Sequence, residues 1–137
     1  SDCVFGSNTN GGISVGYYWD MMPLINIYNT QFITNSDAPI NVERSALNIS
    51  NTTFHGNLGG GLSANNNSQI EIDNSIFSND TSTVGGAIEC MNSTLLIDNT
   101  EFSNNVGYSQ GGAIYLYQSI SRIDSCQFNN NSTINFI

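Results

Sequence analysis

Two segments, IDNSIFSNDTSTVGGAIECMN (residues 72–92) and IDNTEFSNNVGYSQGGAIYLY (residues 97–117), repeat each other almost position by position. Alignment on phenylalanine extends this repeat to nearly the whole chain of 137 residues. Six phenylalanines recur at intervals of 22 to 27 residues: Phe5, Phe32, Phe54, Phe77, Phe102 and Phe128. A period of this length is typical of solenoid proteins, in which each repeat forms one turn of a coil.

Other positions keep one residue type relative to each phenylalanine. Five residues earlier lies an isoleucine: Ile27, Ile49, Ile72, Ile97 and Ile123. Two residues earlier lies a small side chain: Cys3, Thr30, Thr52, Ser75, Thr100 and Cys126. Three residues later lies an amide or, once, a carboxylate: Asn8, Asn35, Asn57, Asp80, Asn105 and Asn131. Glycine pairs follow in most repeats, so equivalent positions are predicted to occupy equivalent environments.

Within each repeat, apolar and polar residues alternate with a period of two, as in LNISNTTF and IEIDNSIF, which indicates short strands separated by Asn and Gly turns. One such unit cannot bury its apolar face alone, but stacked units can. We therefore predict an all-β parallel solenoid of about five coils, a single domain over residues 1–137 without obvious end caps. Stacked asparagines should form an amide ladder, and glycines should supply the positive φ of the corners. The segments between Asn and Gly-Gly, such as VGYSQ, are expected to be loops, and residues 16–24 an insertion.

The pattern FxxN followed by GGAI, present as FSNNVGYSQGGAI and nearly so as FSNDTSTVGGAI, resembles the repeats of the chlamydial polymorphic outer membrane proteins and related surface proteins. This resemblance covers almost the whole chain, most strongly Ile49 to Asn131. It implies a right-handed parallel β-helix that acts outside the cell as an adhesin or a structural stalk. The fold alone does not specify a function, because many functions share one fold.

Charge excludes some partners. The chain has eleven acidic residues, two arginines and no lysine, for a net charge of −9. This sign disfavours nucleic acid and anionic membrane surfaces as partners. No apolar run approaches the roughly 18 residues needed to span a bilayer. Because charge is scarce, attached glycan is expected to help solubility, and we expect a secreted or cell-surface protein that is a processed or partial product.

The stacked carboxylates Asp73, Asp98 and Asp124 are the candidates for catalysis or metal binding, since they share one column four residues before each phenylalanine. Such a column can act as an acid/base pair, bind Ca²⁺, or simply be a solvated surface. A polysaccharide-active enzyme would also want a basic group. Arg44, Arg122 and His55 fall in three different columns, Arg122 on the face of Asp124. We predict no enzymatic activity and no cofactor, with Ca²⁺ as the alternative.

The cysteines suggest how copies associate. Cys3 and Cys126 occupy one column at opposite ends of the chain, too far apart for a disulfide within one molecule but adjacent if copies stack head to tail. Otherwise each replaces the Ser or Thr of its column, and Cys90 is a packing residue or a free thiol. The chain opens and closes within a repeat. It is therefore either a self-stacking unit, joined through Cys3, Cys126, Phe5, Phe128 and Phe136, or a segment of a longer stalk.

Seven Asn-x-Ser/Thr sequons are present. Asn51 and Asn131 are expected to be buried in ladder columns, and the predicted glycosylation sites are Asn48, Asn66, Asn79, Asn92 and Asn130.

Tyr17, Tyr18 and Trp19 form the predicted contact patch, with Tyr108, Tyr115 and Tyr117 as further aromatics. The sequence thus predicts an extracellular structural protein that stacks with itself into a filament. The alternatives are a β-helical stalk or adhesin segment that binds glycan or a host or cell surface and, third, a polysaccharide-active enzyme.

Overall fold

A computed structural model describes residues 2–16 and 21–135, and these residues form strands and turns without a helix. Three long sheets make the walls. The first sheet contains β1 (Cys3–Gly6), β4 (Thr30–Ile33), β7 (Thr53–His55), β10 (Ile76–Ser78), β14 (Glu101–Ser103) and β18 (Gln127–Asn129). The second contains β2 (Ile13–Val15), β5 (Ile40–Glu43), β8 (Leu62–Asn65), β12 (Ile88–Met91) and β16 (Ile114–Tyr117). The third contains β3 (Leu24–Tyr28), β6 (Ala46–Ser50), β9 (Gln69–Asp73), β13 (Thr94–Asp98) and β17 (Ile120–Asp124).

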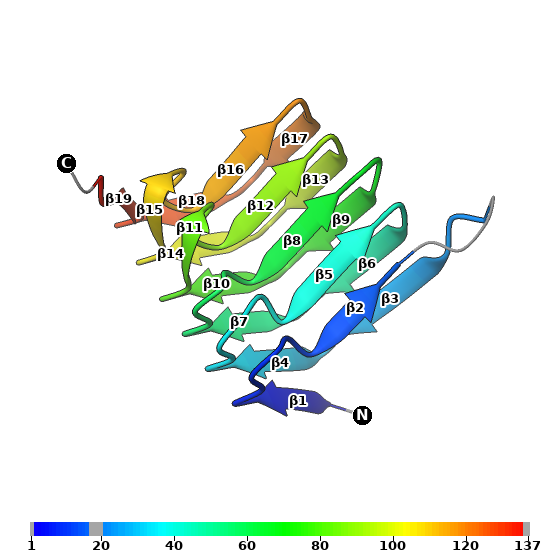
Figure 1. Ribbon diagram of the computed structural model, residues 1–137, viewed down its shortest axis with the longest axis horizontal. Coiled ribbons are helices and arrows are strands. Elements are labelled where there is room, and N and C mark those ends of the chain that lie inside the picture. Colours follow the sequence, from blue (N-terminus) through cyan, green and yellow to red (C-terminus); the bar gives the residue numbers. More distant parts are fainter. Residues whose placement is uncertain (1, 17–20, 136–137) are drawn as a thin grey trace.

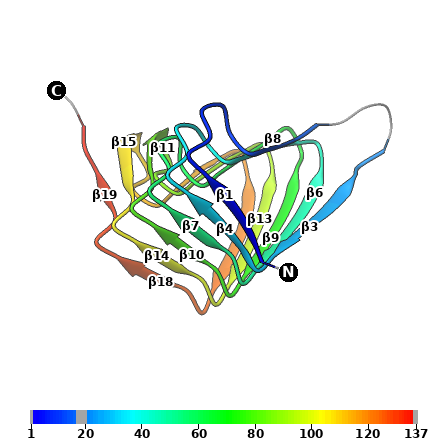
Figure 2. The ribbon, with the colours of Figure 1, turned by 90° about the horizontal axis from the view of Figure 1, so that it is seen from below.

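Each coil contributes one strand to each wall, and every strand lies parallel to its counterpart in the next coil (Figure 1). The register is strict: Phe5 pairs with Phe32, Phe54 with Phe77, and Phe102 with Phe128. Seen from below the first coil, the walls enclose a core of roughly three-sided cross-section (Figure 2). The predicted all-β parallel solenoid of about five coils is confirmed.

The core consists of vertical columns of one residue type. The phenylalanine rings of the first sheet stack with centroids 4.3 to 5.1 Å apart and planes 3 to 17° from parallel. Phe32, Phe54, Phe77 and Phe102 are fully buried. Aliphatic columns from the other two walls complete the core, among them Ile40–Leu62–Ile88 and Ile49–Ile72–Ile97. A core residue therefore packs against the same side-chain type one coil above and one below.

The corners between the walls depend on left-handed backbone, supplied mainly by asparagine rather than glycine. Ten asparagines have positive φ: Asn29, Asn51, Asn66, Asn67, Asn74, Asn79, Asn92, Asn99, Asn104 and Asn130. Asparagine tolerates this conformation better than other residues with a Cβ. The prediction that Asn51 is buried in a ladder is wrong, because Asn51 has φ 48° and points into solvent at a corner.

A small polar side chain follows two of the three corners and closes the turn from inside. The hydroxyls of Thr30, Thr52, Ser75 and Thr100 each donate to the carbonyl two residues earlier, at 2.8 to 3.0 Å. Ser45, Ser93 and Ser119 make the same bond at another corner, at 2.9 Å. These buried polar groups are thereby paired, which removes the desolvation cost of placing them inside.

The segments expected to be loops between Asn and Gly-Gly are strands in the later coils. β11 (Thr81–Val84), β15 (Val106–Gln110) and β19 (Ser132–Thr133) pair in parallel as a small fourth sheet, the ridge sheet. Glycine is required where this sheet meets the second wall. A Cβ on Gly86 would overlap the carbonyl oxygen of Gly112 and lie 2.6 Å from the amide nitrogen of Val106. Alternation alone did not reveal these strands, because the segments lack a clear apolar pattern.

Replacement of Phe77 by Ala should destabilise the protein by about 3–5 kcal/mol, because it removes a fully buried ring from the middle of the stack. The neighbouring Ile76 is the matched control, since it lies on the same strand but points outward and is 41% exposed. Ile76→Ala should cost less than about 1 kcal/mol. Chemical denaturation measures both, and equal losses for the two variants would contradict the stacked core.

Candidate functional site

The outer face of the third sheet carries the stacked carboxylates. Asp73, Asp98 and Asp124 are in direct register on β9, β13 and β17. Asp73 and Asp98 line a groove of about 440 Å³, together with Glu71, Leu96 and Arg122 among others. The sequence predicted Arg122 on the face of Asp124. The register confirms this and places Arg122 in the neighbouring column, beside Leu96, which lies beside Glu71. The groove therefore contains the guanidinium and two of the three aspartates.

The aspartates of this column already have local partners. The Asp73 carboxylate accepts the Asn74 amide at 2.6 Å and the Asn99 amide at 3.4 Å. The Asp98 and Asp124 carboxylates accept the backbone N–H of the next residue, at 3.0 and 2.9 Å. These bonds connect each aspartate to the left-handed corner residues beside it, Asn74, Asn99 and Ser125. The carboxylates therefore have a structural role at the corner whether or not they bind anything else.

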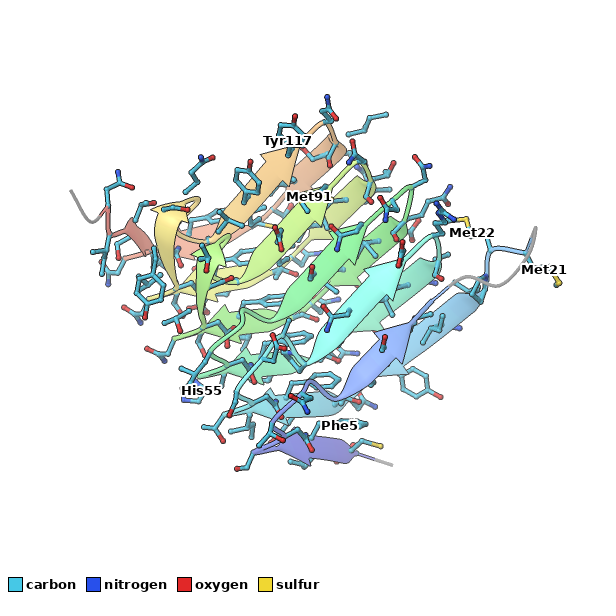
Figure 3. The ribbon with its side chains drawn as sticks, in the orientation of Figure 1. Phe5, Met21, Met22, His55, Met91 and Tyr117 are labelled. Atoms are coloured by element: carbon cyan, nitrogen blue, oxygen red, sulfur yellow. The ribbon has the colours of Figure 1, made fainter. Side chains whose placement is uncertain are left out.

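The other candidate catalytic residues lie apart from this groove. His55 is exposed on the first sheet, where its Nδ1 lies 2.9 Å from the hydroxyl of Ser78 (Figure 3). It is the last residue of strand β7. Arg44 occupies a corner between the second and third sheets, with φ 48°. Within residues 2–16 and 21–135, no three His, Cys, Asp or Glu side chains gather closely enough to hold a metal ion.

Asp98→Asn should stabilise the protein by about 0.2–1 kcal/mol at low salt, because it removes a like charge directly between two others. The asparagine Oδ1 can still accept the Asn99 N–H, so the corner is kept. The gain should vanish near 1 M salt, where the screening length falls to about 3 Å. Thermal unfolding at two salt concentrations measures this. A rise in the midpoint on adding millimolar Ca²⁺ to the unsubstituted protein, absent in the variant, would instead assign a cation site to the column.

The amide ladder is present at the third corner. The side-chain amide of Asn8 donates to the Oδ1 of Asn35 at 2.8 Å, and Asn35 donates likewise to Asn57 at 2.8 Å. Asn57 then donates to Asp80, and Asn105 to Asn131 at 2.9 Å. Each backbone N–H in the ladder also donates to the next Oδ1. The ladder thus connects its six members in one column, through side-chain amides except between Asp80 and Asn105, where the backbone N–H of Asp80 makes the bond.

Asp80 is the exception in this ladder. Its carboxyl is fully buried, and burial raises the pKa from 3.8 to about 7 although two hydrogen bonds from Asn57 favour the charged form. Its Oδ1 accepts both the backbone and the side-chain N–H of Asn57, at 2.8 Å. Its Oδ2 and the Oδ1 of Asn65 are the buried side-chain oxygens without a hydrogen-bond partner in the described part of the chain.

Core columns reach the surface at the last described coil. Leu116, Ile123 and Phe128 have inward positions in their strands, yet 38, 39 and 47% of their surface is exposed. With Ile114 and Asn131 they line a hollow of about 450 Å³. An apolar surface formed by ordered core columns is a candidate for continued stacking.

Core columns also reach the surface at the first coil. Cys3, Phe5, Ile13, Ile27 and Thr30 line a hollow of about 310 Å³, and Figure 3 shows Phe5 at this lower end of the stack. Cys3 is exposed and in register with Thr30, while Cys126 follows Thr100 in the same column. The Cys126 thiol donates to the carbonyl of Asp124 at 2.9 Å, the bond that Ser or Thr makes in this column. Cys90 is buried, as a packing residue would be.

The predicted glycosylation sites lie at accessible positions. Asn66, Asn79, Asn92 and Asn130 are exposed at left-handed corners. Asn48 is half-buried on β6, where its amide donates to Asn26 at 3.0 Å. Asn131 is partly buried in the ladder, as expected.

The aromatic residues divide into two groups. Tyr17, Tyr18 and Trp19 lie outside the described residues, as does Phe136. Tyr115 and Tyr117 lie on β16, with Tyr117 beside Met91 of β12 (Figure 3). Tyr108 lies on β15 and is 42% exposed. Tyr108, Tyr115 and Tyr117 therefore belong to the last coils, whereas Tyr28 lies on β3 in the first coil.

The family model described as "Right handed beta helix region" matches residues 11–136. No curated protein and no solved structure matches the chain. None of the described residues belongs to a helix long and apolar enough to cross a bilayer.

Proposed function

Because the chain belongs to the family of right-handed β-helix regions, we propose that it is a non-enzymatic structural protein whose copies stack head to tail into a filament. The observation that carries this proposal is the match between the two terminal coils. Strand pairing would continue across the junction in the first sheet, with β1 of one copy placed on β18 of the next. Because the first sheet has six strands and the second and third have five each, the other two walls would be one strand short at the junction. Contacts of this head-to-tail kind do not close, so they produce fibres.

The columns of the first sheet would continue through such a junction. Phe5 would stack on Phe128, and Asn8 would follow Asn131, each pair continuing an existing column. A second copy of this chain would therefore extend the phenylalanine column and the amide ladder that the terminal coils leave open.

The distribution of charge also favours contact between copies at their terminal coils over contact between their side walls. Eight of the eleven acidic residues lie between Asp37 and Glu101, in the middle coils. Among the described residues before Asp37 and after Glu101, the charged side chains are Asp2, Arg122 and Asp124. Two strongly acidic molecules would thus meet where neither is strongly charged, while their middle coils repel side-by-side contact.

The cysteines would reinforce the junction. Cys3 of one copy would lie one coil from Cys126 of the next, about 4.8 Å between Cα atoms. This separation is within the range of about 4.4–6.8 Å that a disulfide needs. Forming the S–S bond would release two protons and transfer two electrons to dissolved oxygen or to a small-molecule disulfide. The junction is proposed to form with or without this bond.

A location outside the cell is part of this proposal. It is supported by the exposed sequons at Asn66, Asn79, Asn92 and Asn130, which glycan would occupy. The similarity of the FxxN and GGAI motifs to polymorphic outer membrane protein repeats also supports a surface role. Glycan at Asn66, Asn79 and Asn92 would project sideways and leave the coil ends clear, whereas Asn130 borders the hollow of the last coil and would have to stay unmodified at a junction.

Electron microscopy of the purified protein should reveal unbranched fibres with an axial repeat of roughly 29 Å, which corresponds to the six strands of the first sheet at about 4.8 Å each. Ile123→Asp should abolish them, because it places a charge in a core column at the junction. Ile120→Asp is the matched control: it lies on the same strand, points outward and is 73% exposed. This control should still assemble, and circular dichroism should give β-rich spectra for both variants.

Monomeric rods at every protein concentration would refute the filament. Fibres that persist in Ile123→Asp would refute the assigned junction. Gels without reductant should show a ladder of linked copies that collapses in reductant and is absent in Cys126→Ser. Fibres in Cys126→Ser would show that non-covalent pairing suffices.

A second function is binding on a side face, as a stalk or adhesin would do. It is favoured by the groove beside Glu71, Leu96 and Arg122, which combines a cation, acids and an apolar side chain. Binding to surface glycans that is lost in Arg122→Ala and kept in Ile123→Asp would support this function over the filament.

A further inference from the structure

We propose that Asp80 makes the amide ladder pH-sensitive: with a proton on its carboxyl the ladder is continuous, and without it the ladder is interrupted between the coils of Asp80 and Asn105. This inference is independent of stacking, because Asp80 lies in the middle of the chain.

The hydrogen bonds of the neighbouring ladder asparagines show which bonds an asparagine at position 80 would donate. The Nδ2 of Asn105 donates to the Oδ1 of Asn131 at 2.9 Å and to the carbonyl of Phe77, in the preceding coil, at 2.9 Å. The Nδ2 of Asn57 makes the equivalent pair of bonds, to Asp80 at 2.8 Å and Phe32 at 3.1 Å. Each ladder amide therefore donates twice, once to either side along the stack.

Asp80 has an oxygen where these residues have an NH₂ group. By the register of the ladder, its Oδ2 corresponds to the Nδ2 that would donate to the Oδ1 of Asn105 and the carbonyl of Phe54. Both of these groups are acceptors, and Oδ2 has no partner. A protonated carboxyl can donate to one of them, whereas a carboxylate would place a negative charge against two oxygens in a site without solvent.

No charged side chain on an adjacent strand offsets the cost of burying the Asp80 carboxylate. The titratable side chains on adjacent strands are His55 on β7, Glu101 on β14 and Tyr108 on β15, and none is buried beside the ladder. β10, the strand before Asp80, has none. The causes that set the raised pKa of Asp80 are burial and, in the opposite direction, the two bonds from Asn57. The Asp80 proton is therefore controlled by pH rather than by an ion pair.

The direction in which stability changes with pH follows from the difference between the pKa values of Asp80 in the folded and unfolded states. The carboxyl has a pKa near 3.8 when unfolded and about 7 when folded, so between these values the folded state holds a proton that the unfolded state has released. The stabilisation is fully present below pH 3.8 and is lost as pH rises to about 7. The coils around Asp80 should be held together most firmly in acid.

The test compares unfolding of the unsubstituted protein and Asp80→Asn from pH 4.5 to pH 8. The asparagine restores both donations, so the variant should gain in stability relative to the parent as pH rises. The ratio of their unfolding constants should change by a factor on the order of 100 to 1,000 over this range. Asp98→Asn, which removes an equal charge from the outer face, is the control and should follow the parent's pH profile within about tenfold.

Two further measurements make the proposal falsifiable without reference to global stability. The ¹³C signal of the Asp80 side chain should titrate near neutral pH, and the infrared stretch of a protonated carboxyl should be present at pH 5.5 and absent in Asp80→Asn. Asn35→Asp, at another fully buried ladder position, should acquire its own loss of stability with rising pH. Titration of Asp80 near pH 4, or parallel pH profiles for the parent and Asp80→Asn, would overturn the inference.

Discussion

In-register parallel pairing places every wall side chain directly above and below the equivalent side chains of the neighbouring coils. Each position must therefore be compatible with its own kind at about 4.8 Å. Phenylalanine satisfies this by stacking on the next phenylalanine, aliphatic side chains by packing, and asparagine by donating to one neighbouring asparagine and accepting from another. The core and the ladder therefore consist of residue types that interact favourably with a second copy of the same residue.

The same constraint makes two acidic positions costly in different ways. Asp73, Asp98 and Asp124 repeat a charge, but they are at the surface, where solvent and the adjacent corner amides reduce the cost. Asp80 is a single carboxyl in a buried column of amides, so its cost arises from the missing donor rather than from repulsion. The requirement that neighbouring coils carry compatible side chains is therefore met at small cost by the surface aspartates, whereas it makes the buried site of Asp80 sensitive to pH.

The constraint also governs where the molecule can associate. A side wall exposes alternating polar columns that are complete in themselves, whereas a terminal coil exposes core columns that lack their next member. Leu116, Ile123 and Phe128 are exposed for this reason, although the same columns are buried in the middle coils. Stacking extends a pattern already present in the fold. Side-face binding would need features specific to one coil, such as Arg122.

The sequence by itself determined the coil number, the parallel strands, the phenylalanine column and the ladder, because a strict repeat combined with a period of two admits one way of burying the apolar positions. The single columns of Cys3 and Cys126 were predictable for the same reason. Asn51 was misplaced, since asparagine is favoured both in ladders and in left-handed corners, and only the backbone conformation distinguishes the two. Tertiary structure alone decided the ridge sheet, which forms from segments without alternation because their neighbours above and below supply hydrogen-bond partners. That Arg122 shares a face with the acids was predictable, because it lies two residues from Asp124 on one strand. Tertiary structure also decided that the Oδ2 of Asp80 is buried without a hydrogen-bond partner, because this depends on which residues from other coils lie beside it.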